Sequence, residues 1–107
     1  MPRDLPSEIR ALIDQHPILI FMKGNRDNPM CGFSATAVRI FDVLGAPYET
    51  VDILGDSALR EAIKTFSSWP TIPQVYVKGQ FLGGSDIVRE MYERGELEML
   101  VQGAIAH

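Results

Sequence analysis

The sequence predicts an α/β fold, a four-stranded mixed β-sheet flanked by helices, in a single domain that covers residues 1–107. The run Ile18 to Met22 is apolar at every position, which is typical of a central strand with helices on both faces. Further along, Lys78 and Gly79 separate two short strand-like runs, which indicates an antiparallel hairpin. The chain is 46% hydrophobic and 22% charged, as in an ordinary globular domain.

The first half of the chain contains one strand-helix-strand unit. Apolar residues at helical spacing predict a helix over residues 5–15, which ends before Pro17. After the strand at 18–22 we expect a polar loop, a second helix that stops at Gly45, and a second strand, at residues 24–30, 33–44 and 48–53. A helical crossover makes the two strands parallel.

The second half contains a helix, the hairpin and two further helices. The helix begins at Asp56 or Ser57 and ends before Trp69, and the hairpin strands cover residues 74–77 and 80–82. Ser85 is expected to be the N-cap of a helix that reaches about residue 94, before a terminal helix over residues 96–104. With one parallel pair and one antiparallel pair, the sheet is mixed, and this order of elements predicts a thioredoxin-like sandwich.

Composition argues against several classes of partner. A net charge of −4 and a pI of about 5.0 give no general attraction to nucleic acid. The longest purely apolar run, Ile18 to Met22, is far shorter than the roughly 20 residues that cross a bilayer. The first sixteen residues lack the apolar centre of a secretion signal. We therefore expect no nucleic acid, no membrane and a cytoplasmic location, which a single unpaired cysteine also favours.

Cys31 is the only cysteine, and it lies where the polar loop meets the second helix. An internal disulfide is impossible, and Ser34 three residues later excludes a Cys-x-x-Cys exchange. At a helix start the sulfur faces free backbone amides, which favour the thiolate, the form that attacks disulfides and binds metals. A buried apolar cysteine is the alternative, and its neighbours Pro29 and Gly32 argue against it. Any chemistry at Cys31 must be completed by another molecule.

Three further features are candidate binding groups. Ile72 precedes a proline at the start of a strand, where a cis peptide is expected and where its backbone could pair with an extended peptide. A turn proline without a ligand role explains this segment equally well. The segment Gly83 to Asp86 offers a helix N-terminus to a carboxylate, although such a segment is more often a simple cap. Lys23 is expected near the cysteine, whereas a lone cation such as Arg60 is usually solvated.

The remaining distinctive side chains receive no chemical role. His16 and His107 form no ligand cluster in the sequence, so neither is expected to bind metal. Met30 and Trp69 are expected to pack rather than react. The sequence has no Ser-His-Asp grouping, phosphate-binding glycine loop or zinc-ligand spacing.

Four motifs together resemble the monothiol glutaredoxins of the Cys-Gly-Phe-Ser type, over nearly the whole chain. In order, they are Met22-Lys23-Gly24, Pro29 to Ser34, Trp69 to Gln74 and Gly83 to Ile87. The resemblance implies a thioredoxin-like fold, a glutathione site and a [2Fe-2S] cluster held between two subunits. It implies that Cys31 is the cluster ligand and the catalytic thiol. It places glutathione on Lys23, Gly32, Phe33, Arg60, Thr71, Ile72, Pro73, Gly84, Ser85 and Asp86.

The chemistry of glutathione agrees with this resemblance. Its two carboxylates and one ammonium match two cations, a helix N-terminus and Asp86. A [2Fe-2S] cluster usually has four thiolate ligands, so a dimer with one cysteine per chain needs two more from glutathione. Many relatives have cysteine where this chain has Ser85, so an internal disulfide is absent here, while the backbone amide remains.

The resemblance leaves three functions open. The favoured one is storage of an iron-sulfur cluster in a glutathione-bridged homodimer and its transfer to acceptor proteins. The second is glutathione-dependent thiol-disulfide exchange at Cys31. We expect it to be weak, because the loop over residues 24–30 is longer than in dithiol relatives. The third is an adaptor that shares a cluster with a BolA-type partner.

Overall fold

The computed structural model describes residues 2–105. Every predicted helix and strand is present, with bounds that differ by one or two residues, and the loop after the first strand contains a small extra hairpin. The elements are α1 (Leu5–Gln15), β1 (Ile18–Met22), β2 (Gly24–Asn25), β3 (Asn28–Pro29), α2 (Gly32–Leu44), β4 (Glu49–Asp52), α3 (Ser57–Ser67), β5 (Gln74–Val77), β6 (Gln80–Gly83), α4 (Ser85–Glu93) and α5 (Glu96–Ile105).

The main sheet is mixed, with the strand order β4-β1-β5-β6. Strand β1 runs parallel to β4, from Leu19 opposite Glu49 to Met22 opposite Asp52. It runs antiparallel to β5, which pairs antiparallel with β6 through the predicted tight turn. The crossover and the hairpin therefore make the two kinds of pairing that the sequence predicts.

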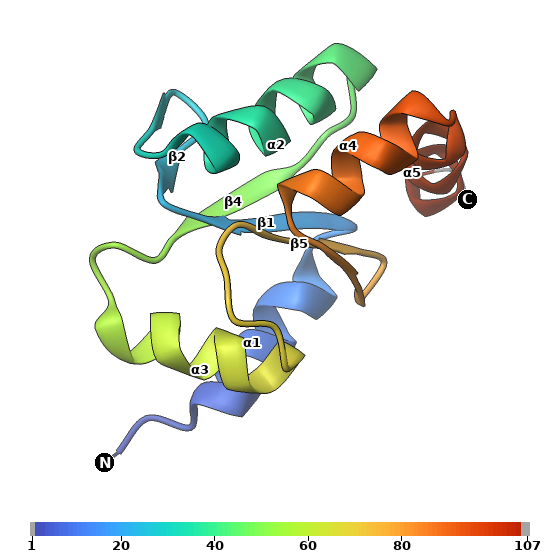
Figure 1. The fold of residues 1–107 in the computed structure, drawn as a ribbon. Coiled ribbons are helices and arrows are strands. Elements are labelled where there is room, and N and C mark those ends of the chain that lie inside the picture. The colour runs from blue at the N-terminus through green and yellow to red at the C-terminus, as the bar shows by residue number, and fades with distance from the viewer. Residues whose placement is uncertain (1, 106–107) are drawn as a thin grey trace.

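Helices cover both faces of this sheet, with α2, α4 and α5 on one face and α1 and α3 on the other (Figure 1). The side chains of β1 alternate between the two cores. Ile18, Ile20 and Met22 pack in the first core, and Leu19 and Phe21 in the second. All five are at most 1% exposed, which explains why the run is apolar without alternation.

One predicted helix boundary is wrong. The N-cap of α4 is Gly84, and Ser85 is the first helical residue, with no side-chain cap hydrogen bond. Gly84 has an extended backbone, with φ −90° and ψ −166°, so the helix begins one residue later than expected. Ser85 is instead buried in the first turn, at 7% exposure.

The loop between β1 and α2 is a two-strand hairpin rather than an irregular polar segment. Its ends are joined by a 2.8 Å hydrogen bond from the Met30 amide to the Lys23 carbonyl. Gly24 has a φ of 85°, and a Cβ there would collide with the Asn28 carbonyl oxygen. The hairpin delivers the chain directly to the start of α2.

Two contacts hold this hairpin against β4. The Gly24 amide donates to Asp52 Oδ1 at 3.0 Å. The Arg26 guanidinium lies 4.1 Å from the centre of the Tyr48 ring and donates to the Tyr48 carbonyl oxygen. The residues before Cys31 therefore have a fixed position relative to the sheet.

The register of α2 predicts very different costs for two truncations on the same helix. Phe41 is 0% exposed, so Phe41→Ala is expected to lower the free energy of unfolding by about 3 to 5 kcal/mol. Val43, on the opposite face, is 64% exposed, and Val43→Ala is expected to change it by less than about 0.5 kcal/mol. Urea denaturation measures both, and equal losses would contradict the register.

Candidate functional site

Cys31 is the N-cap of α2, with an extended backbone at φ −156° and ψ 152°. Its Sγ accepts a hydrogen bond from the Ser34 amide at 3.4 Å, so a sulfur occupies the position in which an oxygen usually caps a helix. The residue is partly exposed and is a free thiol. The alternative of a cysteine enclosed in the apolar core is excluded.

The surroundings of Cys31 favour its thiolate. Partial burial alone raises the pKa of the thiol. Hydrogen bonds from the Ser34 amide and hydroxyl and from the Phe33 amide, together with the charge of Lys23, outweigh burial and hold the pKa below its ordinary value. The expectation that Lys23 lies near the cysteine is confirmed by this charge interaction.

Ser34 contacts the thiol and is not among the site residues predicted from the sequence. It is fully buried, its Oγ accepts from the Lys23 amide at 3.2 Å, and the same Oγ lies 3.6 Å from the Cys31 sulfur. The hydroxyl thereby links the end of β1 to the thiol. Ser34 could have been identified from its position in the sequence, three residues after Cys31. At an N-cap, the backbone amide of the third following residue donates a hydrogen bond to the capping side chain.

A cavity of about 400 Å³ lies between the start of α2, helix α3, the loop over residues 68–73 and the start of α4. Cys31 does not line this cavity, whereas Phe33, on the first turn of α2, and Lys23, whose charge acts on the sulfur, do. Gly32 does not line the cavity; it is exposed at the start of α2, with nothing within 4 Å of a Cβ built there. All the other predicted glutathione residues do line it, namely Lys23, Phe33, Arg60, Thr71, Ile72, Pro73, Gly84, Ser85 and Asp86.

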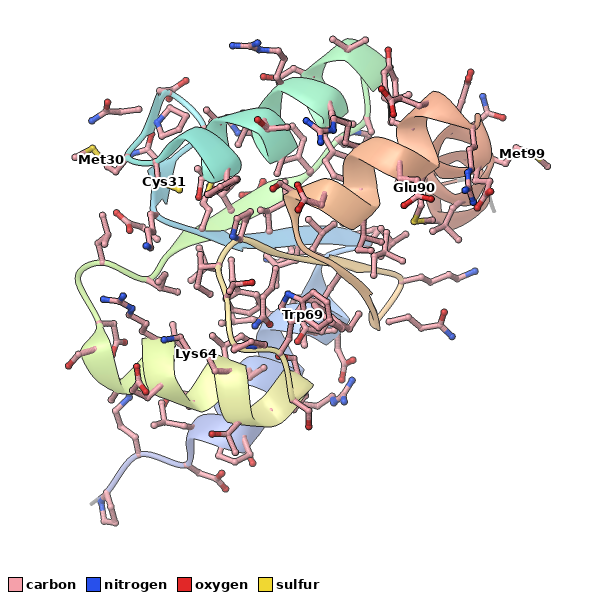
Figure 2. The ribbon with its side chains drawn as sticks, viewed as in Figure 1. Met30, Cys31, Lys64, Trp69, Glu90 and Met99 are labelled. Carbon is pink, nitrogen blue, oxygen red and sulfur yellow. The ribbon has the colours of Figure 1, made fainter. Side chains whose placement is uncertain are left out.

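Several lining residues were not predicted, among them Lys64 and Trp69. Lys64 follows Arg60 by one helical turn, and this spacing is the signal that could have identified it. Trp69 does pack, with its ring 5.7 Å from that of Phe81, but it also forms part of the cavity wall. Both residues lie on the α3 side of the site (Figure 2).

Met30, which is expected from the sequence to pack rather than react, is largely exposed to solvent. The hairpin turns its side chain outward, and it is 58% exposed beside Cys31 at the start of α2 (Figure 2). Phe33, on the first turn of the helix, is 64% exposed. The thiol therefore has large apolar side chains on both sides along the chain.

The cavity is suited to an anionic ligand. Lys23, Arg60 and Lys64 line it, and Gly84, the N-cap of α4, has no side chain that could cap the free amides at the start of that helix. The buried Nε atom of Arg60 and the buried Nε1 atom of Trp69 have no acceptor within the described part of the chain. Donors of this kind are satisfied when a ligand supplies the acceptor oxygen.

The predicted cis peptide between Ile72 and Pro73 is present at the wall of the cavity. Within residues 2–105, the Ile72 amide donates no backbone hydrogen bond. Among the same residues, no three His, Cys, Asp or Glu side chains gather into a metal site. His107 lies outside the described residues.

Comparison with known proteins agrees with this geometry. The glutaredoxin family model matches residues 18–82. A Synechocystis protein named as an uncharacterised monothiol glutaredoxin is 50% identical over 103 residues, which cover 92% of this chain and 96% of that protein. A rice monothiol glutaredoxin named as chloroplastic is 46% identical over 105 residues, which cover 94% of this chain and 62% of that longer protein.

Solved structures show the same architecture. The reduced apo form of poplar GrxS14 has a TM-score of 0.84 and 45% identity, with 96% of this chain and 94% of the poplar chain covered. A buckwheat glutaredoxin-glutathione complex has a TM-score of 0.84 over 96% of each chain, and its 24% identity supports the fold alone. The predicted thioredoxin-like fold is thus confirmed, and the chain belongs to the monothiol glutaredoxins.

Proposed function

We propose that this protein holds a [2Fe-2S] cluster in a homodimer bridged by glutathione and transfers the cluster to acceptor proteins. One observation carries the proposal: a partly exposed cysteine with a lowered pKa lies two residues before Phe33, which lines a cavity with three cations, in a chain with no second thiol. Such a sulfur is an available ligand, but one chain supplies only one of four thiolates.

The cavity supports glutathione as the additional thiol. Its volume of about 400 Å³ is in the range of small-molecule sites. The two carboxylates would pair with Lys23, with Arg60 and with the start of α4, and the ammonium with the exposed carboxylate of Asp86. The backbone of Ile72 would pair with the extended tripeptide as an added strand does. The buckwheat relative of the same fold was solved with glutathione.

The other predicted residues complete this site. We propose contacts from the Phe33 ring and from the walls formed by Thr71, Pro73, Gly84 and Ser85. Gly32 lies outside the lining, and its proposed role is to leave open space beside the sulfur.

The proposed stoichiometry follows from the number of thiols. Cys31 from each of two chains and the sulfurs of two glutathione molecules make four ligands. The exposed side chains of Met30 and Phe33 give the sulfur an apolar rim, which a second copy of the chain would cover. Loss of glutathione would remove two ligands and release the cluster to an acceptor.

A lowered pKa at Cys31 also favours glutathione-dependent thiol-disulfide exchange as a second function. The thiolate would attack the glutathione sulfur of a mixed disulfide, release the substrate thiolate and form a disulfide between Cys31 and glutathione. A second glutathione thiolate would then attack this disulfide, release Cys31 and leave as oxidised glutathione. We expect slow turnover, because the segment over residues 24–30 is longer than in dithiol relatives and would misplace the attacking glutathione.

Two expectations stay predictions. The first is a BolA-type partner that shares the cluster. The second is a cytoplasmic location, for which a free thiol suits a reducing compartment. Relatives named as chloroplastic or mitochondrial occupy other compartments. Within the described part of the chain, no helix combines the length and apolar character needed to cross a bilayer.

Anaerobic reconstitution with iron, sulfide and glutathione tests the proposed function. The wild-type protein is expected to gain visible absorption and to elute as a dimer. Cys31→Ser is expected to lose both, because two of the four ligands disappear from each dimer. Omission of glutathione is the matched control and should also prevent assembly. A colourless monomer that rapidly reduces glutathione mixed disulfides would defeat the carrier hypothesis in favour of exchange.

Removal of either cation is expected to weaken glutathione binding. Lys23→Ala and Arg60→Ala should each cost about 1 to 3 kcal/mol, the range for a charge-assisted hydrogen bond at a partly exposed site. Titration calorimetry of the cluster-free protein measures the effect. Lys78→Ala and Arg39→Ala remove exposed cations that do not line the cavity and should leave the affinity unchanged. Equal affinities in all four variants would remove Lys23 and Arg60 from the site.

Ser34→Ala is expected to raise the pKa of Cys31 towards its ordinary value, because the variant loses the hydroxyl that lies 3.6 Å from the sulfur. Ultraviolet titration of the thiolate measures this shift. Thr36→Ala removes a hydroxyl from the same helical turn that does not contact the sulfur, and it should leave the pKa of Cys31 unchanged.

The lowered pKa of Cys31 also predicts how stability depends on pH. Since folding lowers the pKa, the thiolate stabilises the wild-type fold above the unfolded pKa, and this stability is lost as pH falls through the lowered value. A pH-independent difference in stability between wild type and Cys31→Ser would contradict the assignment.

A further inference from the structure

We propose that Gln74 is a positioning residue, whose buried side-chain amide fixes the loop over residues 68–73 and thereby sets the wall of the cavity. The effect on ligand affinity rests on the proposed glutathione function. The placement of the loop is a property of the protein itself and can be measured without a ligand.

The loop has few hydrogen bonds of its own. The Trp69 amide donates to the end of α3, at the carbonyl oxygen of Lys64. Two of the following four residues are prolines and have no amide hydrogen. No backbone amide bond from Thr71 or Ile72 to another residue is found within residues 2–105. The segment therefore depends on groups outside its own backbone.

Gln74 supplies those groups from the first position of β5. Its Nε2 donates to the Trp69 carbonyl oxygen at 3.0 Å and to the Thr71 carbonyl oxygen at 3.3 Å. Its Oε1 accepts from the Tyr76 hydroxyl at 3.4 Å. The residue is 0% exposed, and both of its N–H donors are used. One side chain thus binds two carbonyl groups of the loop.

The strand makes this anchor rigid. Gln74 pairs with Phe21 of the central strand, in the register of β1 with β5. The loop that it holds contributes Trp69, Thr71 and Ile72 to the cavity, which faces the cations of α3 and the start of α4. A displaced loop would change its distance from α3 and from the start of α4. The width of the cavity, and with it the fit of an extended ligand, would then change.

The thiol is held by other contacts. Cys31 takes its hydrogen bonds from Ser34 and Phe33, and its nearest cation is Lys23, none of which belongs to the loop. A change at Gln74 is therefore expected to alter ligand affinity and loop position while the pKa of Cys31 stays the same. General destabilisation of the fold would not separate these properties in this way.

Two variants test the inference, with a matched control. Gln74→Glu keeps the shape but places a carboxylate against two carbonyl oxygens, and Gln74→Met keeps the length without any donor. Gln80→Glu makes the same charge change at an exposed position on β6. Trp69 is the only tryptophan in the chain, so acrylamide quenching of its fluorescence in the ligand-free protein reports the loop directly.

Both Gln74 variants are expected to expose Trp69 to quencher and to raise the dissociation constant of glutathione about tenfold, with the Cys31 pKa unchanged. Quenching in Gln74→Glu should fall back towards the wild-type level as pH decreases, because the neutral carboxylic acid has one O–H donor. Gln74→Met should show no such recovery, and Gln80→Glu should behave as wild type.

Wild-type quenching and wild-type glutathione affinity in either folded Gln74 variant would overturn the inference. A Gln74→Glu protein that does not fold leaves the decision to Gln74→Met, which introduces no charge. A wild-type protein that binds no glutathione would contradict the proposed function, whereas the quenching comparison would still decide whether Gln74 places the loop.

Discussion

The burial of β1 on both faces is the constraint on which the rest of the structure depends. A strand that is apolar at every position is stable only between two helical layers, and residues 18–22 are enclosed in this way. The thiol, the hairpin and Gln74 all make contacts with residues at the carboxyl end of this strand. Lys23 continues β1 and bonds to Ser34, Met22 lies opposite Asp52, and Phe21 lies opposite Gln74. The end of one enclosed strand thus fixes the positions of the thiol, the hairpin and the cavity wall.

The two faces of the sheet contribute different chemistry to the site. Helices α2 and α4, on one face, supply the thiol and an uncapped helix start. Helix α3, on the other face, supplies Arg60 and Lys64, and the loop after it passes over the sheet to β5. The cavity exists because these two layers meet at one end of β1. The thiol and the cations of α3 therefore depend on separate cores that share a single strand.

The sequence predicts most of the fold because its signals are local. The apolar run of β1, the Lys78-Gly79 turn, with both residues at positive φ, and the left-handed Gly45 at the end of α2 all follow from neighbouring residues. The failures depend on the assembled fold. The extended backbone of Gly84 makes it the cap in place of Ser85, which is buried, and the hairpin turns Met30 outward. Gln74 reaches the carbonyl oxygens of Trp69 and Thr71 only when β5 and the loop before it are assembled, so the order of the motifs predicts the site but not this supporting contact.

The sulfur that caps α2 has a consequence for the helix itself. An ordinary cap is a hydroxyl or carboxylate whose lone pairs serve only the backbone, whereas the lone pairs of Cys31 are also its reactive electrons. Whenever they form a bond to another atom, the first turn of α2 shares its cap with that bond. The hydrogen bonds at the start of the helix are therefore coupled to the bonding state of the sulfur. Under the proposed function, binding and release of a cluster would alter the stability of this first turn, next to the exposed side chains of Met30 and Phe33.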